Sequence, residues 1–189
     1  MAFHSIDLFG GSIVADLPSS FADVSDFRQV PDHQEVYLDK DGFTSIVVEI
    51  LERVEQPDIE ALKYHLHDLV DTDASQTKII TAAEAHFAKL PPGTSAYTLL
   101  AIAPPDEKQR GRANEPDFVA IYLTMLRLPE QKTDLLVAVN VPYIAGQYDP
   151  ATINQEAGQL GSLGQNALSI RDTILQTLNI KDWSLFVQD

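Results

Sequence analysis

Residues 118–141 read FVAIYLTMLRL-PEQK-TDLLVAVNV, two apolar runs joined by four residues. Apolar side chains fall on both faces of each run, which is typical of strands that are covered on both sides. The short connection at 129–132 returns the second run beside the first, as in an antiparallel hairpin. Residues 44–51 form a third run that is apolar on both faces. We therefore predict that these three strands form the middle of an antiparallel sheet.

Shorter extended segments surround these central runs. Gly10 and Gly11 separate two of them and supply the backbone freedom for a turn. Residues 21–28 include Asp23 and Asp26, side chains that favour the start of a single helical turn. The segments expected to add strands are 6–9, 12–17, 34–38, 78–87 and 97–103.

Two helices are predicted from apolar side chains spaced three and four residues apart. The first begins at about Pro57, which a first helical turn tolerates, and Tyr64 lies on the side away from its apolar stripe. The second covers 165–178, and the apolar residues at 183–186 are expected to pack back on the domain. The stripe of the first helix comprises Ile59, Leu62, Leu66, Leu69 and Val70. We predict one α+β domain, residues 1–189, with helices over both apolar faces of the sheet.

Composition narrows the class of partner. The chain has 28 acidic and 13 basic side chains and a net charge of −15, and residues 1–60 hold 13 of the acids. Such a surface repels phosphate backbones and anionic lipids, so we expect a basic protein partner and neither nucleic acid nor membrane. The sequence has no cysteine, no apolar segment of membrane-spanning length and no signal-peptide pattern at its start. We expect a soluble, unprocessed, intracellular monomer.

The acidic stretch P-D-H-Q-E-V, residues 31–36, leads from a loop into a predicted strand. Pro31 restricts the path of the backbone and thereby limits the freedom of Asp32 and Glu35. Alternation along the strand would place Leu38 on the core face and Glu35 on the opposite face. We therefore expect both carboxylates on a solvated acidic face that meets a basic partner.

Other roles for the polar residues remain open on these patterns. Asp32 and Glu35 would suit a hydrolase that uses an acid and a base, and the helix face with Tyr64 would suit a trafficking scaffold. His65 and His67 point about 200° apart on a helix and so cannot share a metal ion. The sequence contains neither a dinucleotide-binding fingerprint after a strand nor a nucleophile elbow. We therefore expect no catalytic residue, metal or cofactor.

Six blocks of the sequence resemble the Mog family, the Ran guanine-nucleotide release factors, in order and spacing as well as in residues. Residues 72–117 match that family poorly, and His33 and Leu66 depart from its usual side chains. The matching blocks are L-F-G-G-S-I at 8–13, D-V-S-D-F-R-Q-V-P-D-H-Q-E-V at 23–36, S-I-V-V-E-I-L-E at 45–52, Y-H-L-H-D-L at 64–69, R-L-P-E-Q-K-T-D-L-L-V-A-V-N-V-P at 127–142 and D-W-S-L-F at 182–186.

The resemblance implies a fold, a partner and a site. The fold would be an antiparallel sheet of about six strands sandwiched between helices, as in the PsbP proteins. The partner would be the GTPase Ran, whose nucleotide the protein would release without catalysis, in nuclear protein import and hence in nucleus and cytoplasm. The binding acids of the family fall on Asp32 and Glu35. The residues expected to flank them at the Ran interface are Asp23, Asp26, Gln34 and Tyr64.

Overall fold

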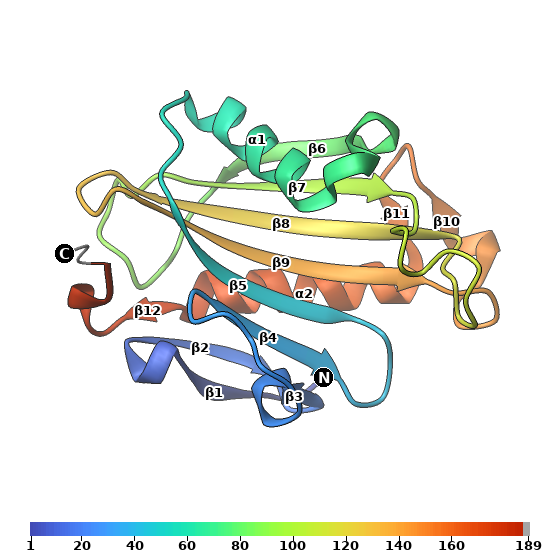
Figure 1. Ribbon diagram of the computed structural model, residues 1–189, viewed down its shortest axis with the longest axis horizontal. Helices are drawn as coiled ribbons and strands as arrows, with labels where there is room; N and C mark the ends of the chain where they lie inside the picture. The colour runs from blue at the N-terminus through green and yellow to red at the C-terminus, as the bar shows by residue number, and fades with distance from the viewer. Residues whose placement is uncertain (187–189) are drawn as a thin grey trace.

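A computed structural model describes residues 1–186, and its largest element is a sheet of seven antiparallel strands. The strands follow the order β3-β4-β5-β9-β8-β7-β6 (Figure 1). Their bounds are β3 (Phe21–Asp23), β4 (Gln34–Asp39), β5 (Ser45–Glu52), β6 (Lys78–Ala85), β7 (Ala96–Ala103), β8 (Phe118–Leu128) and β9 (Thr133–Tyr143). The three strands that are apolar on both faces, β5, β9 and β8, are adjacent in the middle of the sheet, as predicted.

The hairpin of β8 and β9 is the longest pairing in the sheet. Its register runs from Phe118 opposite Tyr143 to Leu128 opposite Thr133, and a turn at 129–132 closes it. Nearly every side chain of both strands is buried, because the sheet is covered on both faces. The predicted antiparallel hairpin is therefore confirmed.

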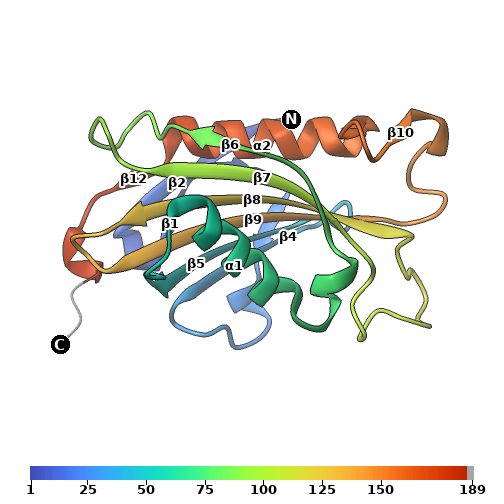
Figure 2. The same cartoon turned by 90° about the horizontal axis from the view of Figure 1, so that it is seen from above.

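One helix covers each face of the large sheet (Figure 2). Helix α1 (Asp58–Val70) packs Leu62 and Leu66 against β7, β8 and β9. Helix α2 (Gly161–Thr177) packs Ile170 against the opposite face, in a separate core cluster. This layering confirms the α+β class. Within residues 1–186, none of the helices has the length and apolar character needed to cross a membrane.

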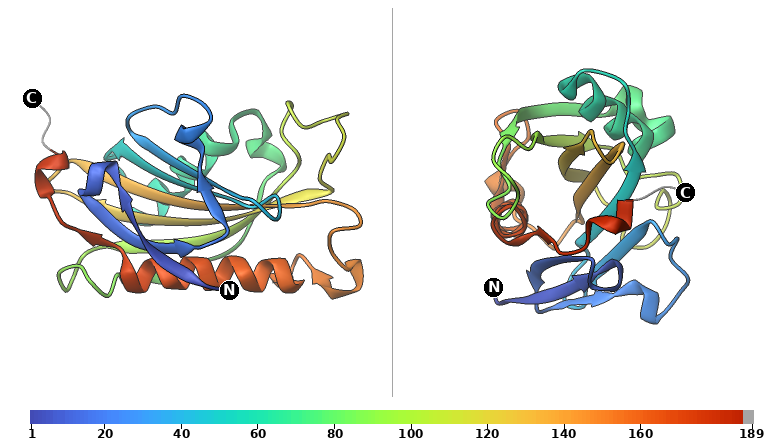
Figure 3. Two further views of the ribbon diagram at one scale, coloured as in Figure 1. Left: turned by 90° about the horizontal axis from the view of Figure 1, so that it is seen from below. Right: turned by 90° about the vertical axis from the view of Figure 1, so that its left-hand side faces the viewer.

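A smaller sheet lies beneath β4 and against α2, close to the C-terminal segment (Figure 3). It consists of β1 (Phe3–Leu8), β2 (Ile13–Pro18) and β12 (Asn179–Ile180), with β2 in the centre. The turn between β1 and β2 is the short 3-10 helix η1 (Phe9–Gly11). The remaining elements are η2 (Val24–Asp26), η3 (Asp71–Gln76), η4 (Pro150–Thr152), β10 (Ile153–Asn154), β11 (Gln159–Leu160) and η5 (Trp183–Phe186). Phe186 is buried and packs on the domain as predicted, whereas Trp183 is 37% exposed.

A buried polar cluster fastens α1 to the β8–β9 hairpin. Asp134 is fully buried and accepts hydrogen bonds from Arg127 Nε at 3.0 Å and from Val54 N–H at 3.1 Å, while its other contact is His65 Nε2 at 2.8 Å. Arg127 also bonds Asp58 at the start of α1, at 3.0 Å. Burial raises the pKa of Asp134, but the hydrogen bonds of these partners outweigh it and hold the pKa below its ordinary value. His65 is thus a core histidine.

Three local predictions need correction. Leu38 is 45% exposed while Tyr37 is buried, because the smaller sheet packs on the face of β4 that carries Tyr37. In α1, Ile59 and Leu69 are exposed, because the face that meets the sheet is centred on the residues between 61 and 66. Helix α2 begins at Gly161, four residues before its predicted start. Within residues 21–28, by contrast, the predicted single helical turn is confirmed as the 3-10 turn η2, which strand β3 precedes.

Candidate functional site

An acidic cavity of about 350 Å³ lies at the beginning of β4, where both carboxylates of the P-D-H-Q-E-V stretch are found. Its wall is formed by the η1 turn, by η2 and the segment that follows it, by the start of β4 and by the C-terminal turn η5. Backbone bonds from Lys181 and Asp182 to Ser12 O hold the C-terminal segment beside the β1–β2 hairpin. The residues that line the acidic cavity are Phe9, Ser25, Val30, Pro31, Asp32, Gln34, Glu35 and Leu185.

Glu35 connects β4 to the η1 turn. Its Oε1 accepts a hydrogen bond of 2.7 Å from the backbone N–H of Phe9. The turn is unusual because Phe9 has a φ of 50°, a value that residues other than glycine rarely adopt. Gly10 follows with a φ of 66°. The Glu35 carboxylate therefore supports a backbone conformation that a phenylalanine would not hold alone.

Glu35 is half-buried, which corrects the expectation that it would stand on a fully solvated face. Burial raises the pKa of Glu35 above its ordinary value of 4.5; the Phe9 N–H offsets part of this rise, and the charge of Asp23 adds to it. A carboxylate that has lost part of its hydration interacts more strongly with a nearby cation than a fully solvated one does. Glu35 is thus suited to receive a positively charged group from a partner.

Asp32 is exposed, as predicted, in the turn between Pro31 and β4. A backbone bond from Gln34 N–H to Pro31 O at 3.0 Å closes this turn and fixes the position of Asp32 relative to the strand. Asp32 and Glu35 both line the acidic cavity, one exposed at its edge and the other half-buried within it. The prediction that the two acids lie together is therefore confirmed, whereas the prediction that Glu35 is fully solvated is wrong.

The flanking polar residues have local structural roles as well. Asp23 caps η2, since its Oδ1 accepts bonds from the N–H of Ser25 at 2.8 Å and from the Ser25 hydroxyl at 2.7 Å. Asp26 is exposed in η2 and is not part of the cavity wall. Gln34 donates its amide to Glu49 Oε1 at 3.0 Å and lines the cavity. These acids add negative charge around Glu35 without competing for its hydrogen bond.

Tyr64 lies apart from the acidic cavity. It is 50% exposed on α1, with its ring edge-on to His65 at 5.8 Å between centroids. Helix α1 covers the face of the large sheet opposite to the small sheet that carries the η1 turn (Figure 1). The structure therefore does not bring Tyr64 to the two acids, and a shared interface would require a partner that reaches both faces.

Sequence reasoning missed Phe9 and Leu185, the members of the cavity wall that come from segments distant from the acidic stretch. The Gly10-Gly11 pair signalled a turn but gave no sign of which strand it would contact. Residues 1–186 contain no group of three histidine, aspartate or glutamate side chains able to hold a metal ion. The arrangement that does exist, a fixed acid and an exposed acid on a rigid strand, is suited to binding a basic surface.

Comparison with known proteins connects this geometry to a family. The family described as "Ran-interacting Mog1 protein" matches residues 6–142. A Dictyostelium discoideum protein named probable ran guanine nucleotide release factor is 29% identical across 99% of this chain and 98% of its own length. The Ran guanine nucleotide release factor of Bos taurus is 32% identical across 71% of this chain and 74% of its own.

The fold gives the same result. The crystal structure of the Saccharomyces cerevisiae Ran-binding protein Mog1p superposes with a TM-score of 0.74 at 25% sequence identity, and covers 99% of this chain and 100% of that one. The matched residues 6–142 include the η1 turn, the acidic stretch and all seven strands of the large sheet up to Pro142. The chain therefore belongs to the Ran-interacting Mog1 family.

Proposed function

We propose that this chain binds the small GTPase Ran through the acidic cavity and promotes the release of guanine nucleotide from Ran. The observation that carries the proposal is the pair of acids at the start of β4, with Glu35 held by Phe9 and Asp32 exposed beside it. Relatives of this chain are named Ran guanine nucleotide release factors or nuclear import proteins. We accordingly assign it a role in nuclear protein import, in nucleus and cytoplasm, as a binding protein rather than an enzyme.

The two acids would contribute differently to binding. Asp32 is exposed, so its charge acts mainly on the rate and orientation of encounter with a basic surface, and that contribution weakens as salt is added. Glu35 is fixed and partly desolvated, so an ion pair with it would slow dissociation of the complex. Residues 1–60 supply 13 of the 28 acids, which extends the negative field around both.

Nucleotide release would follow from linkage. If the chain binds nucleotide-free Ran more tightly than loaded Ran, it weakens nucleotide binding by the same factor, and added nucleotide weakens the complex in return. A tenfold preference corresponds to about 1.4 kcal/mol of coupling, which is within the usual range for coupled sites. The chain needs no catalytic group for this action.

Stopped-flow release of a fluorescent guanine nucleotide from Ran tests the proposal. The wild-type chain should accelerate release in proportion to its concentration until it saturates Ran. A variant with Asp32→Asn and Glu35→Gln should give the rate of Ran alone. Release that is accelerated equally by the wild type and by the folded double variant would contradict the assignment of the site.

A further inference from the structure

A second cavity, of about 310 Å³, opens at the other end of β4, where the hairpin loop before β5 carries Phe43. It shares no lining residue with the acidic cavity. The strand between the two spans six residues, or about 20 Å at the usual rise per residue. A ligand in this second cavity would therefore leave the two acids at the start of β4 uncovered.

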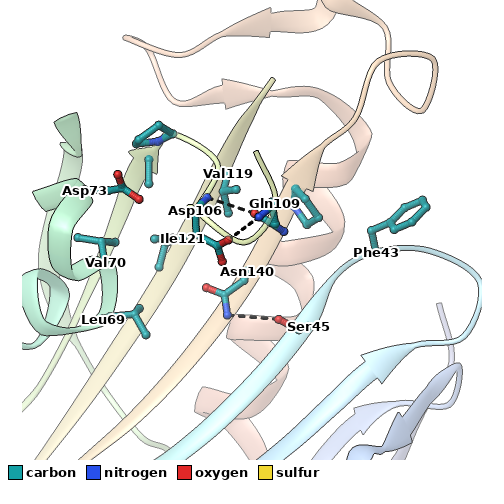
Figure 4. Close-up of a pocket in the computed structure, with 13 residues that line it drawn as sticks. Phe43, Ser45, Leu69, Val70, Asp73, Asp106, Gln109, Val119, Ile121 and Asn140 are labelled. Atoms are coloured by element: carbon teal, nitrogen blue, oxygen red, sulfur yellow. Dashed lines mark hydrogen bonds between the residues drawn. The ribbon is translucent and has the colours of Figure 1, made fainter. Parts of the chain in front are cut away.

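The second cavity exists because α1 ends before the sheet does. Helix α1 stops at Val70, the 3-10 turn η3 follows it with Asp73 in the cavity wall, and Val119 and Ile121 of β8 form an apolar floor. Figure 4 shows Leu69 and Val70 on one side of this floor and the loop of Phe43 on the other. The volume is at the lower end of the range for ligand sites, which suits an inserted side chain rather than a large cofactor.

Hydrogen-bond acceptors converge on this apolar floor. Asn140 lies within the central strand β9 and donates its amide to Ser45 Oγ at 3.3 Å, which leaves its carbonyl oxygen without a partner among the described residues. Asp106 receives the N–H of Gln109 on Oδ1 at 2.9 Å, and its Oδ2 has no partner within residues 1–186. Figure 4 shows the Asn140 amide between Ser45 and the loop that carries Asp106.

The charges around the second cavity favour a cation. The acids of the wall are Asp73 and Asp106, and no basic side chain is among the described lining residues. Arg110 of the loop pairs with Asp73 at 2.5 Å, so Asp106 is the acid of this wall that has no ion-pair partner within residues 1–186, while Lys108 and Arg112 of the same loop are exposed and do not line the cavity. The net charge of −15 adds attraction for a basic segment.

We propose that this second cavity binds an arginine side chain of a basic peptide segment in a partner protein, independently of the acidic cavity. The alkyl part of the arginine would lie on Val119 and Ile121, because this contact removes apolar surface of both the floor and the aliphatic chain from water. The planar guanidinium has five donors and would bridge the free oxygens of Asp106 and Asn140, which a single ammonium point charge bridges less well.

The test is a ¹⁵N NMR titration of the full chain with acetyl-leucyl-arginyl-leucine amide. The expected result is a saturable shift of backbone amides lining the second cavity, such as those of residues 119, 121 and 140. The matched ligand contains citrulline in place of arginine, which keeps the shape and removes the charge, and should bind about two- to fivefold more weakly. Equal binding of the two peptides would overturn the proposal.

Asp106→Asn supplies the matched protein variant, since an asparagine oxygen still accepts the Gln109 N–H and preserves the loop. It should weaken the arginine peptide about two- to fivefold, while Asp68→Asn, at an exposed acid on α1 outside the cavity, should not. Chemical-shift changes confined to residues around Glu35 would contradict the assignment. So would a titration in which free agmatine saturates the site and the peptide does not. Ran affinity measured on Asp106→Asn should equal wild type, which separates failure of this site from failure of the acidic cavity.

Discussion

Replacing Glu35 by alanine should destabilise the fold, because the Phe9 N–H loses its acceptor in a turn with a φ of 50°. A hydrogen bond to a charged group contributes roughly 1.5–3 kcal/mol, and this loss is partly offset because the alanine variant no longer buries a charged carboxylate that burial partly desolvates. We expect a net loss of about 1–2 kcal/mol. For a chain of 189 residues, that corresponds to a Tm lower by roughly 2–8 °C.

Glu35→Gln separates the structural role of this residue from its charge. The amide oxygen of glutamine can accept the same bond from Phe9, so differential scanning calorimetry at pH 7 should give a Tm within about 2 °C of wild type. Asp32→Ala, at an exposed residue, should change the free energy of unfolding by no more than about 0.5 kcal/mol.

The pH dependence of the Glu35→Gln variant has a definite sign. The pKa of Glu35 is raised in the folded state, so the stabilisation by its protonated form is complete below the unfolded value of about 4.5 and is lost as pH rises through the folded pKa. The Tm of Glu35→Gln relative to wild type should therefore increase between pH 4 and pH 7.

If glutamine lowers the Tm as far as alanine does, or if alanine changes nothing, the bond from Phe9 does not hold the turn.

Three further changes test other parts of the structure. Asp134→Ala leaves His65 buried without its carboxylate, and urea unfolding should show a loss of about 3–5 kcal/mol; a loss below about 1 kcal/mol would mean that the buried cluster contributes little. Gly164→Ala places a Cβ 2.7 Å from the Cβ of Leu160, so thermal unfolding should show a loss of roughly 1–3 kcal/mol, and an unchanged Tm would contradict the tight packing of α2. Tyr64→Ala should leave stability within about 0.5 kcal/mol and weaken Ran binding in calorimetry; unchanged affinity would remove Tyr64 from the interface.

The parts of the fold that were predictable have strong local signals. The runs at 118–128 and 133–141 are apolar on both faces, and only a position inside a covered sheet buries such strands completely. The start of helix α1 was predicted to within a residue because Pro57 precedes it and Asp58 and Glu60 occupy its first turn.

The failures concern contacts between segments distant in the sequence. Leu38 was assigned to the core because alternation gives two faces but does not say which is covered, and the smaller sheet covers the other one. Strand β12 has only two residues and exists through its pairing with β2, so it has no local signal. The partner of His65 is Asp134, 69 positions later, and no local pattern around His65 indicates that contact. The same limitation hid the contact between Glu35 and Phe9.

The proposed binding of Ran through the acidic cavity is tested most directly by calorimetric titration of nucleotide-free Ran with two charge-matched variants. The first combines Asp32→Asn with Glu35→Gln, and the control combines Glu130→Gln with Glu156→Gln, two exposed acids outside the cavity wall. Both variants lose two negative charges. The first should lose at least about 100-fold in affinity, or about 2.7 kcal/mol, while the control stays within about threefold of wild type. Equal affinities for the two variants, with both folded, would contradict the account.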